Sequence, residues 1–161
     1  MPADPSCLIH HEKISRSDGR QELRVLYPSR NIGTRHALET VADGLCGFGI
    51  AESDIQAVQQ VLAEILNNVV EHAYGDDADC LIELRIVRED SSIRAQVIDT
   101  GRPMPGGQAP DPDCPDPCAM PEGGFGWYII RALSDDVTYV RDGERNTLSV
   151  ALKLHHAVRP T

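Results

Sequence analysis

Seven of the eleven prolines in this chain lie between residues 103 and 121. Proline fixes φ and has no N–H to donate, so this stretch cannot form the interior of a helix or pair within a sheet. A loop of this length inside a compact domain is usually functional or disordered. The fold must therefore be built from the segments on either side. The loop itself is a candidate lid that closes over a ligand.

The flanking segments alternate between the period of two that is typical of strands and the period near 3.6 that is typical of helices. They predict three pairs of strands, over residues 7–15 and 21–27, 80–88 and 92–99, and 136–141 and 146–154. They also predict three helices, over residues 29–45, 53–74 and 124–133. This order predicts an α+β fold, a two-layer sandwich in which helices cover one face of a mixed, mostly antiparallel sheet.

Polar residues at the expected helix ends predict how the helices begin and end. Ser29 and Ser53 are the predicted N-caps of the first two helices, and Gln56 would complete a capping box with Ser53. The second helix should end with Gly75 in the left-handed conformation. Its expected buried face carries apolar residues at helical spacing: Val58, Val61, Leu62, Ile65 and Val69.

Length and composition limit the class of protein. A chain of 161 residues suits one domain over residues 1–161 with a core over about 21–154, and 4% aromatic residues imply an aliphatic core. A net charge of −10 repels phosphate backbones, so nucleic acid is not an expected direct partner. No signal peptide or membrane span is visible, and five scattered cysteines do not resemble a disulfide framework. We therefore expect a cytoplasmic protein that has no membrane partner.

Two of the cysteines, Cys114 and Cys118, lie in the proline-rich loop. They are either half of a structural zinc site or two incidental thiols. No second cysteine or histidine pair with matching spacing stands near them in the sequence, and both interpretations remain open.

The second expected helix carries a polar stripe beside its apolar face. Glu64, Asn68 and Glu71 are four and three residues apart, so they should share one face of an α-helix. An amide oxygen together with phosphate oxygens and waters suffices to hold Mg²⁺, and a nearby carboxylate can act on a bound nucleophile. The alternative is a solvated polar face without chemistry.

Two further motifs flank the proline-rich loop. Asp99 ends a strand before Thr100-Gly101, where its carboxylate can accept a hydrogen bond from an exocyclic amine such as that of adenine; the alternative is a plain turn. Residues 123–126 read Gly-Gly-Phe-Gly before the last expected helix. Backbone N–H groups there suit a phosphate, and the alternative is a flexible hinge.

Taken in order, these motifs resemble the Bergerat ATPase superfamily, which includes the ATP-binding domains of gyrase, heat-shock chaperones, histidine kinases and MutL. Residues 64–74 look like the N box with a Glu-His-Ala-Tyr ending, which is typical of the anti-sigma-factor serine kinases. Asp99-x-Gly101 and Gly124-x-Gly126 look like the two glycine boxes. Asn146-Thr147 matches the threonine-bearing strand beside the adenine pocket. The resemblance covers residues 23–154.

The resemblance implies a set of roles around bound Mg·ATP. Asn68 would be the Mg²⁺ ligand, Glu64 the catalytic base toward a serine hydroxyl, and Asp99 the partner of the adenine amine. Thr147 would join the adenine network through a water. The remaining nucleotide-binding residues are implied by their places in the motifs: Glu71, His72, Gly101, Pro103, Gly124, Phe125 and Gly126.

The resemblance also implies partners and a lid. Residues 102–123 would be the ATP lid, and Arg35 corresponds to a family arginine at the partner surface. The partners would be a sigma factor and an anti-anti-sigma protein with a STAS domain, and family members commonly form homodimers. The chain departs from the family at Arg102-Pro103, where a third glycine is usual, and at Trp127-Tyr128.

Two functions therefore remain open. One is a serine kinase that phosphorylates the anti-anti-sigma partner. The other is a nucleotide-dependent binding module with little or no kinase activity, which the many aspartates of the loop favour, because carboxylates repel a triphosphate unless they face away or share the metal. A third interpretation, the catalytic domain of a sensor histidine kinase, is disfavoured by the ending of the N box.

Overall fold

The computed structural model describes residues 10–29, 31–74, 80–111 and 125–155. Six strands form one sheet in the order β1-β2-β3-β4-β6-β5, and each of the five pairings is antiparallel. The strands are β1 (His10–Ser15), β2 (Gln21–Pro28), β3 (Leu81–Arg88), β4 (Ser92–Asp99), β5 (Asp136–Asp142) and β6 (Arg145–Lys153). The expected strand pairs are confirmed in their order and nearly in their bounds.

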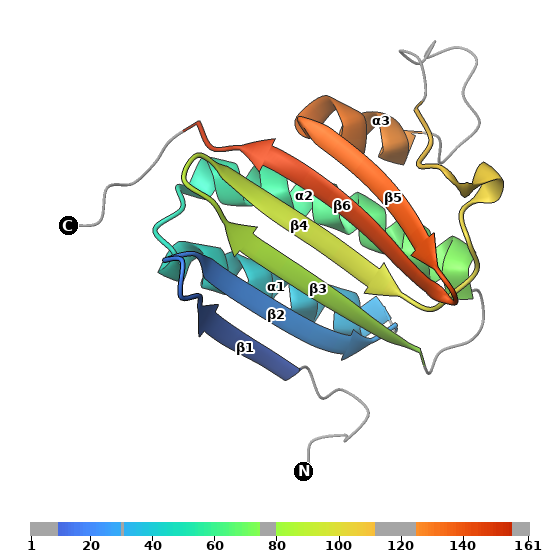
Figure 1. Cartoon of the computed structure of the whole chain (residues 1–161), viewed down its shortest axis with the longest axis horizontal. Coiled ribbons are helices and arrows are strands. Elements are labelled where there is room, and N and C mark those ends of the chain that lie inside the picture. Colours follow the sequence, from blue (N-terminus) through green and yellow to red (C-terminus); the bar gives the residue numbers. More distant parts are fainter. Residues whose placement is uncertain (1–9, 30, 75–79, 112–124, 156–161) are drawn as a thin grey trace.

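Three helices lie side by side on one face of the sheet (Figure 1). They are α1 (Asn31–Gly47), α2 (Glu52–Asn68) and α3 (Phe125–Leu133), and a π-helical turn, Val69–Tyr74, continues α2. The two-layer α+β class is thus confirmed, and the sheet expected to be mixed is antiparallel throughout the described strands. No helix in the described part of the chain is long and apolar enough to cross a membrane.

The core between the two layers is mainly aliphatic, as expected, and it also contains Tyr27 and Phe48. Side chains that alternate along the strands meet the apolar stripe of α2, and all five residues of the expected stripe are buried. α1 packs closely on β2, since a Cβ added to Gly44 would lie 2.5 Å from a methyl carbon of Leu23. This layer of packed side chains fixes the position of α2 relative to the sheet, and with it the positions of the polar side chains at the end of α2.

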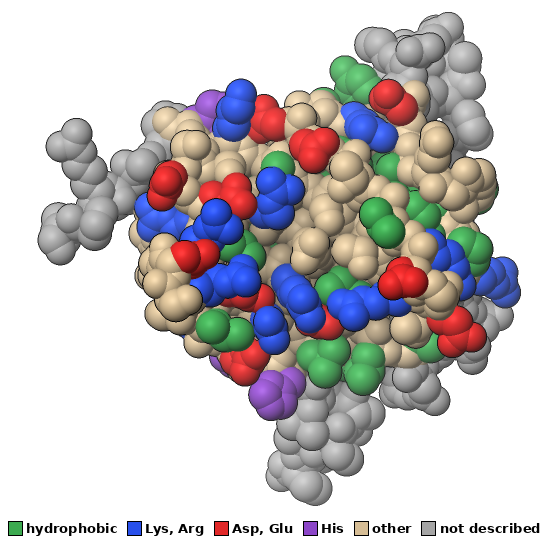
Figure 2. Space-filling view, in the orientation of Figure 1, with side chains coloured by type: hydrophobic (Ala, Val, Ile, Leu, Met, Phe, Trp, Pro, Cys, Tyr) green, Lys and Arg blue, Asp and Glu red, His purple; other side chains and the backbone are tan. Residues whose placement is uncertain are grey.

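The other face of the sheet carries no helix in the described residues, and many charged side chains are spread over it among uncharged ones (Figure 2). Arginines and carboxylates alternate there, with Arg24 2.8 Å from Glu22 and Arg85 2.6 Å from Glu83. The hydrogen bond and charge of Glu22 raise the pKa of the Arg24 guanidinium. These pairs are partly buried, since the side chain of Glu22 is only 5% exposed.

Both predicted serine N-caps are wrong. α2 begins at Glu52 with Ala51 as its N-cap, so Ser53 lies inside the first turn. The start is instead set by Ile50 and Ile55, which have the spacing of a hydrophobic staple and are both buried. α1 begins at Asn31, two residues after Ser29, whose hydroxyl has no hydrogen-bond partner among the described residues.

Two other local expectations change in the structure. The second helix keeps its α-helical form only to Asn68 and then widens into the π-helical turn; Gly75, its expected end, lies outside the described residues. The described part of the proline-rich loop contains a 3-10 turn, Pro105–Gly107, although helix was excluded there. Proline is tolerated at the first position of such a turn because a residue there does not have to donate a backbone hydrogen bond.

Candidate functional site

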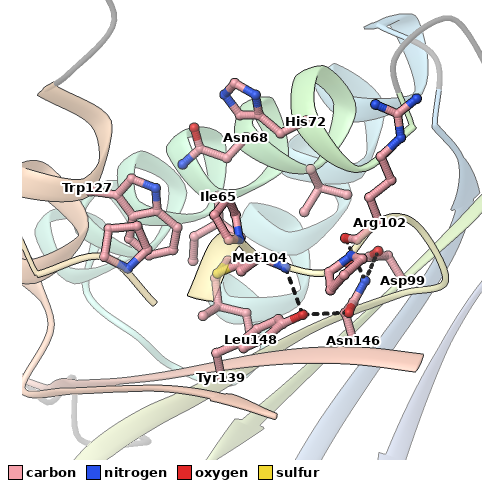
Figure 3. Close-up of a pocket in the computed structure, with 14 residues that line it drawn as sticks. Ile65, Asn68, His72, Asp99, Arg102, Met104, Trp127, Tyr139, Asn146 and Leu148 are labelled. Carbon is pink, nitrogen blue, oxygen red and sulfur yellow. Dashed lines mark hydrogen bonds between the residues drawn. The ribbon is translucent and has the colours of Figure 1, made fainter. Parts of the chain in front are cut away.

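A cavity of about 420 Å³ lies between the end of α2, the loop after β4, the start of α3 and the strands β5 and β6 (Figure 3). Its size is within the range of small-molecule sites, about 300–1,000 Å³. Residues from five separate stretches of the chain line it: Ile65, Asn68, Val69, His72, Asp99, Arg102, Pro103, Met104, Pro105, Pro110, Trp127, Tyr139, Asn146 and Leu148.

The walls of this cavity are mostly apolar, with a few polar groups at defined places. Ile65 lies on one side, Leu148 and Met104 lie on the other, and Val69 also lines the cavity. The indole of Trp127 lies at the α3 end. Such a slot can remove both faces of a flat heterocycle from water, while the polar groups recognise its edge.

Asp99 is the carboxylate of the cavity, at the end of β4. Its side chain is 6% exposed, and its Oδ1 accepts hydrogen bonds from the Gly101 N–H at 2.8 Å and from the Asn146 amide at 2.8 Å. The first of these bonds closes an Asx-turn that ends the strand. No hydrogen bond reaches Oδ2 from the described residues, so that oxygen is an acceptor available to a ligand.

Asn146 is a site residue that the sequence analysis missed. It is 3% exposed and lies in the inward row of β6, which otherwise carries leucine and valine. A buried amide in an apolar row needs hydrogen-bond partners, and this alternation was the signal that could have identified it. The amide oxygen accepts a hydrogen bond from the Tyr139 hydroxyl at 2.6 Å, and the amide nitrogen donates one to Asp99.

Thr147 does not line the cavity. Side chains alternate along β6, so Asn146 and Leu148 point toward the helices and Thr147 points to the opposite face of the sheet. The structure therefore places Asn146, one position before Thr147, among the lining residues of the cavity. In a strand, a shift of one position places a side chain on the wrong face.

Of the three residues that were expected to share a face, Glu64 and Asn68 both lie near Gly126, and Glu71, in the π-helical turn after α2, does not line the cavity. Asn68 lines the cavity, and its buried amide nitrogen has no hydrogen-bond partner among the described residues. Glu71 is exposed and His72 lines the cavity instead, because the π-helical turn begins after Asn68 and changes the spacing. Glu71 and His72 lie 3.9 Å apart as an exposed pair.

Glu64 lies next to the cavity residues but does not line the cavity. Its carboxylate faces the first turn of α3, where a Cβ added to Gly126 would lie 2.9 Å from Oε2 of Glu64 and 3.8 Å from the Asn68 amide nitrogen. Gly126 therefore allows α3 to approach α2 at this point. A carboxylate near the beginning of a helix is also favoured by the helix dipole.

The remaining expected residues fall into three groups. Pro103 lines the cavity, and the Gly101 backbone contacts Asp99 at its edge. Phe125 is exposed and does not line it, and Arg35 lies in a separate hollow between α1 and α2, paired with Glu39 at 3.2 Å. Gly124, Cys114 and Cys118 lie outside the described residues. Among the described residues, no group of three or more His, Cys, Asp or Glu side chains could hold a metal.

The first part of the proline-rich loop is fastened to α3. The guanidinium of Arg131 donates to the carbonyl oxygens of Pro110 at 3.1 Å and Ala109 at 3.2 Å. Asp111 is exposed, and its carboxylate lies 3.9 Å from Arg131, away from the lining of the cavity. The described part of the loop thus forms one wall of the cavity.

This chain is similar to known proteins over most of its length. The model of the histidine kinase-like ATPase domain matches residues 28–152, so the chain belongs to that family. Among curated proteins, it is 23% identical to an anti-sigma F factor of Geobacillus kaustophilus (strain HTA426) over 139 residues, which cover 86% of this chain and 94% of that protein. It is 22% identical to the anti-sigma F factor of Geobacillus stearothermophilus over 143 residues, covering 88% and 97%.

A solved structure of similar fold is that of the RsbU and RsbW domains of Rv1364c from Mycobacterium tuberculosis. The TM-score is 0.61 at 20% sequence identity, and the match covers 87% of this chain and 34% of that chain. This chain therefore spans about a third of the length of that protein. The similarity confirms the fold.

Proposed function

We propose that this chain is an anti-sigma regulatory factor that binds Mg·ATP in the cavity below the proline-rich loop and transfers phosphate to a serine or threonine of a partner protein. The observation that carries this proposal is Asp99, a nearly buried carboxylate with one oxygen available at the edge of an apolar slot. An exocyclic amine such as that of adenine satisfies such an acceptor, and the apolar walls suit its ring.

Asn68 fits the metal of such a ligand. Its buried amide has an atom without a partner, and a half-turn of the amide exchanges its nitrogen and oxygen. Mg²⁺ prefers oxygen ligands and keeps several waters, so one amide oxygen with phosphate oxygens suffices. When bound, the ion neutralises phosphate charge. The phosphates would lie toward the start of α3, whose backbone N–H groups favour anions.

Glu64 is the proposed catalytic base. Its carboxylate lies one helical turn before Asn68 and faces Gly126, so it borders the place assigned to the phosphates. A serine hydroxyl is a weak nucleophile, and a carboxylate within hydrogen-bond reach orients it and accepts its proton. We also propose that residues 102–123 form the ATP lid and that residues 1–161 form one domain.

The partners in this proposal are a sigma factor and a STAS-domain anti-anti-sigma protein, in the cytoplasm. Similarity to two anti-sigma F factors over nearly their full lengths supports a sigma factor as the partner. Arg35 is 82% exposed on α1 and is the proposed contact residue for a partner. We also propose that the chain forms a homodimer, on the basis of its similarity to the anti-sigma F factors.

A second candidate function is a nucleotide-dependent binding module without transfer. One observation favours it: Glu64 does not line the cavity and packs against the first turn of α3 instead. In that case, nucleotide binding would control partner binding, and no phosphate would move. The two candidates share the same nucleotide site and differ only in the role of Glu64.

One experiment separates the two candidates. Calorimetric titration with Mg·ATP is combined with transfer of labelled γ-phosphate to a STAS-domain partner, for the wild type and the Glu64→Ala variant. The kinase predicts saturable ATP binding by both proteins and loss of transfer in Glu64→Ala. Gln60→Ala, an exposed position one turn earlier on α2, is the matched control. Undiminished transfer by Glu64→Ala would remove Glu64 from the mechanism, and absence of transfer by the wild type supports the binding module.

A further inference from the structure

The hydrogen bonds of Asn146 fix the position of the carboxylate that faces the ligand. Its Oδ1 accepts from the Tyr139 hydroxyl at 2.6 Å and from Arg141 at 2.7 Å. Its amide nitrogen donates to Oδ1 of Asp99 at 2.8 Å. Donors on one side and acceptors on the other determine the orientation of the amide, because a flipped amide would face both groups with the wrong atom.

The same amide also holds the first residues of the loop. Its nitrogen lies 3.1 Å from the carbonyl oxygen of Gly101 and 3.3 Å from that of Arg102. The Tyr139 hydroxyl accepts the N–H of Met104 at 3.0 Å, and Arg141 donates to the Gly101 carbonyl at 3.0 Å. Figure 3 shows the chain of contacts from Met104 through Tyr139 and Asn146 to Asp99.

This arrangement divides the two oxygens of Asp99 between the protein and the cavity. Oδ1 already accepts two hydrogen bonds, from Gly101 and Asn146, so the carboxylate cannot rotate without breaking both. Oδ2 accepts no hydrogen bond from the described residues, so it is left as an acceptor for a ligand in the cavity that Asp99 lines. A carboxylate held in this way attracts an exocyclic amine and repels a carbonyl oxygen at the same place on a purine.

We propose that Asn146, held by Tyr139 and Arg141, is a positioning residue that gives the cavity its selectivity for a 6-amino purine over a 6-oxo purine. This inference rests on the proposed function, because it concerns the base of the nucleotide that the cavity binds. In this proposal, Asp99 and Asn146 together determine the selectivity for the base. Tyr139 and Arg141 connect Asn146 to the first residues of the loop.

Substitution of Asp99 gives the sharpest test of this division. In the wild type, the Gly101 N–H and the Asn146 amide donate to Oδ1 of Asp99. In Asp99→Asn, these two donors require the amide oxygen at the place of Oδ1. The amide nitrogen must then take the place of Oδ2 and present a donor to the ligand. The preference should therefore invert, with ITP bound more tightly than ATP, because a 6-oxo group accepts the hydrogen bond that a 6-amine cannot.

The experiment measures Kd for Mg·ATP and Mg·ITP by calorimetry, for the wild type and four variants. The wild type should prefer ATP by about 10-fold or more, as expected for a hydrogen bond to a charged group. In Asn146→Ala, the preference should fall below about 3-fold, because the Asp99 carboxylate then keeps only the Gly101 N–H as a partner and rotates and hydrates more easily. Tyr139→Phe removes the hydroxyl that donates to Asn146 but keeps the Asn146–Asp99 bond, so the preference for ATP should fall only partially and the fold should be kept.

Thr138→Ala is the control, because Thr138 is exposed on the opposite face of β5 from Tyr139. It should leave the ATP preference unchanged. A wild type that binds both nucleotides equally, an Asn146→Ala variant that keeps the full preference, or an Asp99→Asn variant that still favours ATP would each overturn the inference. A wild type that binds neither nucleotide would overturn the proposed function itself, so the two failures are distinguishable. If Asn146→Ala does not fold, Tyr139→Phe and Asp99→Asn decide the question.

Discussion

Gly126→Ala is the substitution that tests the contact between α2 and α3 at the proposed catalytic residue. The added methyl group would lie 2.9 Å from Oε2 of Glu64 and 3.8 Å from the Asn68 amide nitrogen. The second distance is an ordinary contact. The first is short, and it involves the end of a flexible side chain, so the carboxylate of Glu64 is the group that must move.

The size of the movement follows from these distances. An ordinary contact needs about 3.5 Å, so the carboxylate must shift by about 0.5 Å or change rotamer. Misplacement of a catalytic group by about 1 Å costs roughly 100-fold in rate, so transfer should fall about 10- to 100-fold. Stability should change little, because alanine is favoured over glycine in a helix by up to about 1 kcal/mol and this offsets the strain.

The assay compares phosphate transfer, ATP affinity and melting temperature for the wild type and Gly126→Ala. We expect reduced transfer, a Kd for ATP within about 3-fold, and a melting temperature within about 4 °C, since 1 kcal/mol corresponds to about 2–4 °C in a chain of this size. Gly47→Ala is the control, because its methyl group meets only the flexible end of Lys13. Unchanged transfer by a folded Gly126→Ala protein would refute the placement of Glu64 at the reacting hydroxyl.

Three further predictions follow from other parts of the structure. Thr147→Ala should leave the Kd for ATP unchanged within about 2-fold, because that side chain faces away from the cavity; a loss of about 10-fold in a titration would restore the original assignment. Gly33→Ala should destabilise the protein by about 1–3 kcal/mol in urea unfolding, because the methyl group would lie 2.7 Å from the backbone oxygen of Pro28, and an unchanged midpoint would contradict the packing of α1. The hydrogen bond from Ser92 lowers the pKa of Glu89, so this carboxylate stabilises the hairpin at neutral pH and the contribution disappears as pH falls through its folded pKa. Ser92→Ala should therefore cost less than about 1 kcal/mol at pH 7 and nothing near pH 2; an equal cost at both pH values would exclude this linkage.

Much of the fold was predictable because strand alternation is a local property. β4 was predicted from Ser92 to Asp99, and its register places the alternate residues in the core. The starts of α1 and α2 were not predictable from capping residues alone. At α2, burial of Ile50 and Ile55 outweighs the weaker preference for serine at the N-cap, and that burial depends on the whole core.

The candidate site was predictable only where a residue acts through its own motif. Asp99 precedes a glycine at a strand end, and the structure places it in the cavity as expected. Asn146 was missed, because its role depends on which face of β6 points inward and on Tyr139 from the neighbouring strand. His72 was expected at the site together with Glu71, and the π-helical turn brings only His72 to the cavity.

The central claim is that an adenine nucleotide binds in the cavity with its base held by Asp99. Trp127 is the only tryptophan in the sequence and lines this cavity, so its fluorescence reports directly on occupancy. Titration with Mg·ATP should give a saturable change in wild-type emission, and Asp99→Ala should shift the midpoint at least about 10-fold higher. Emission that stays constant while calorimetry detects ATP binding, or an unchanged midpoint in Asp99→Ala, would contradict the account.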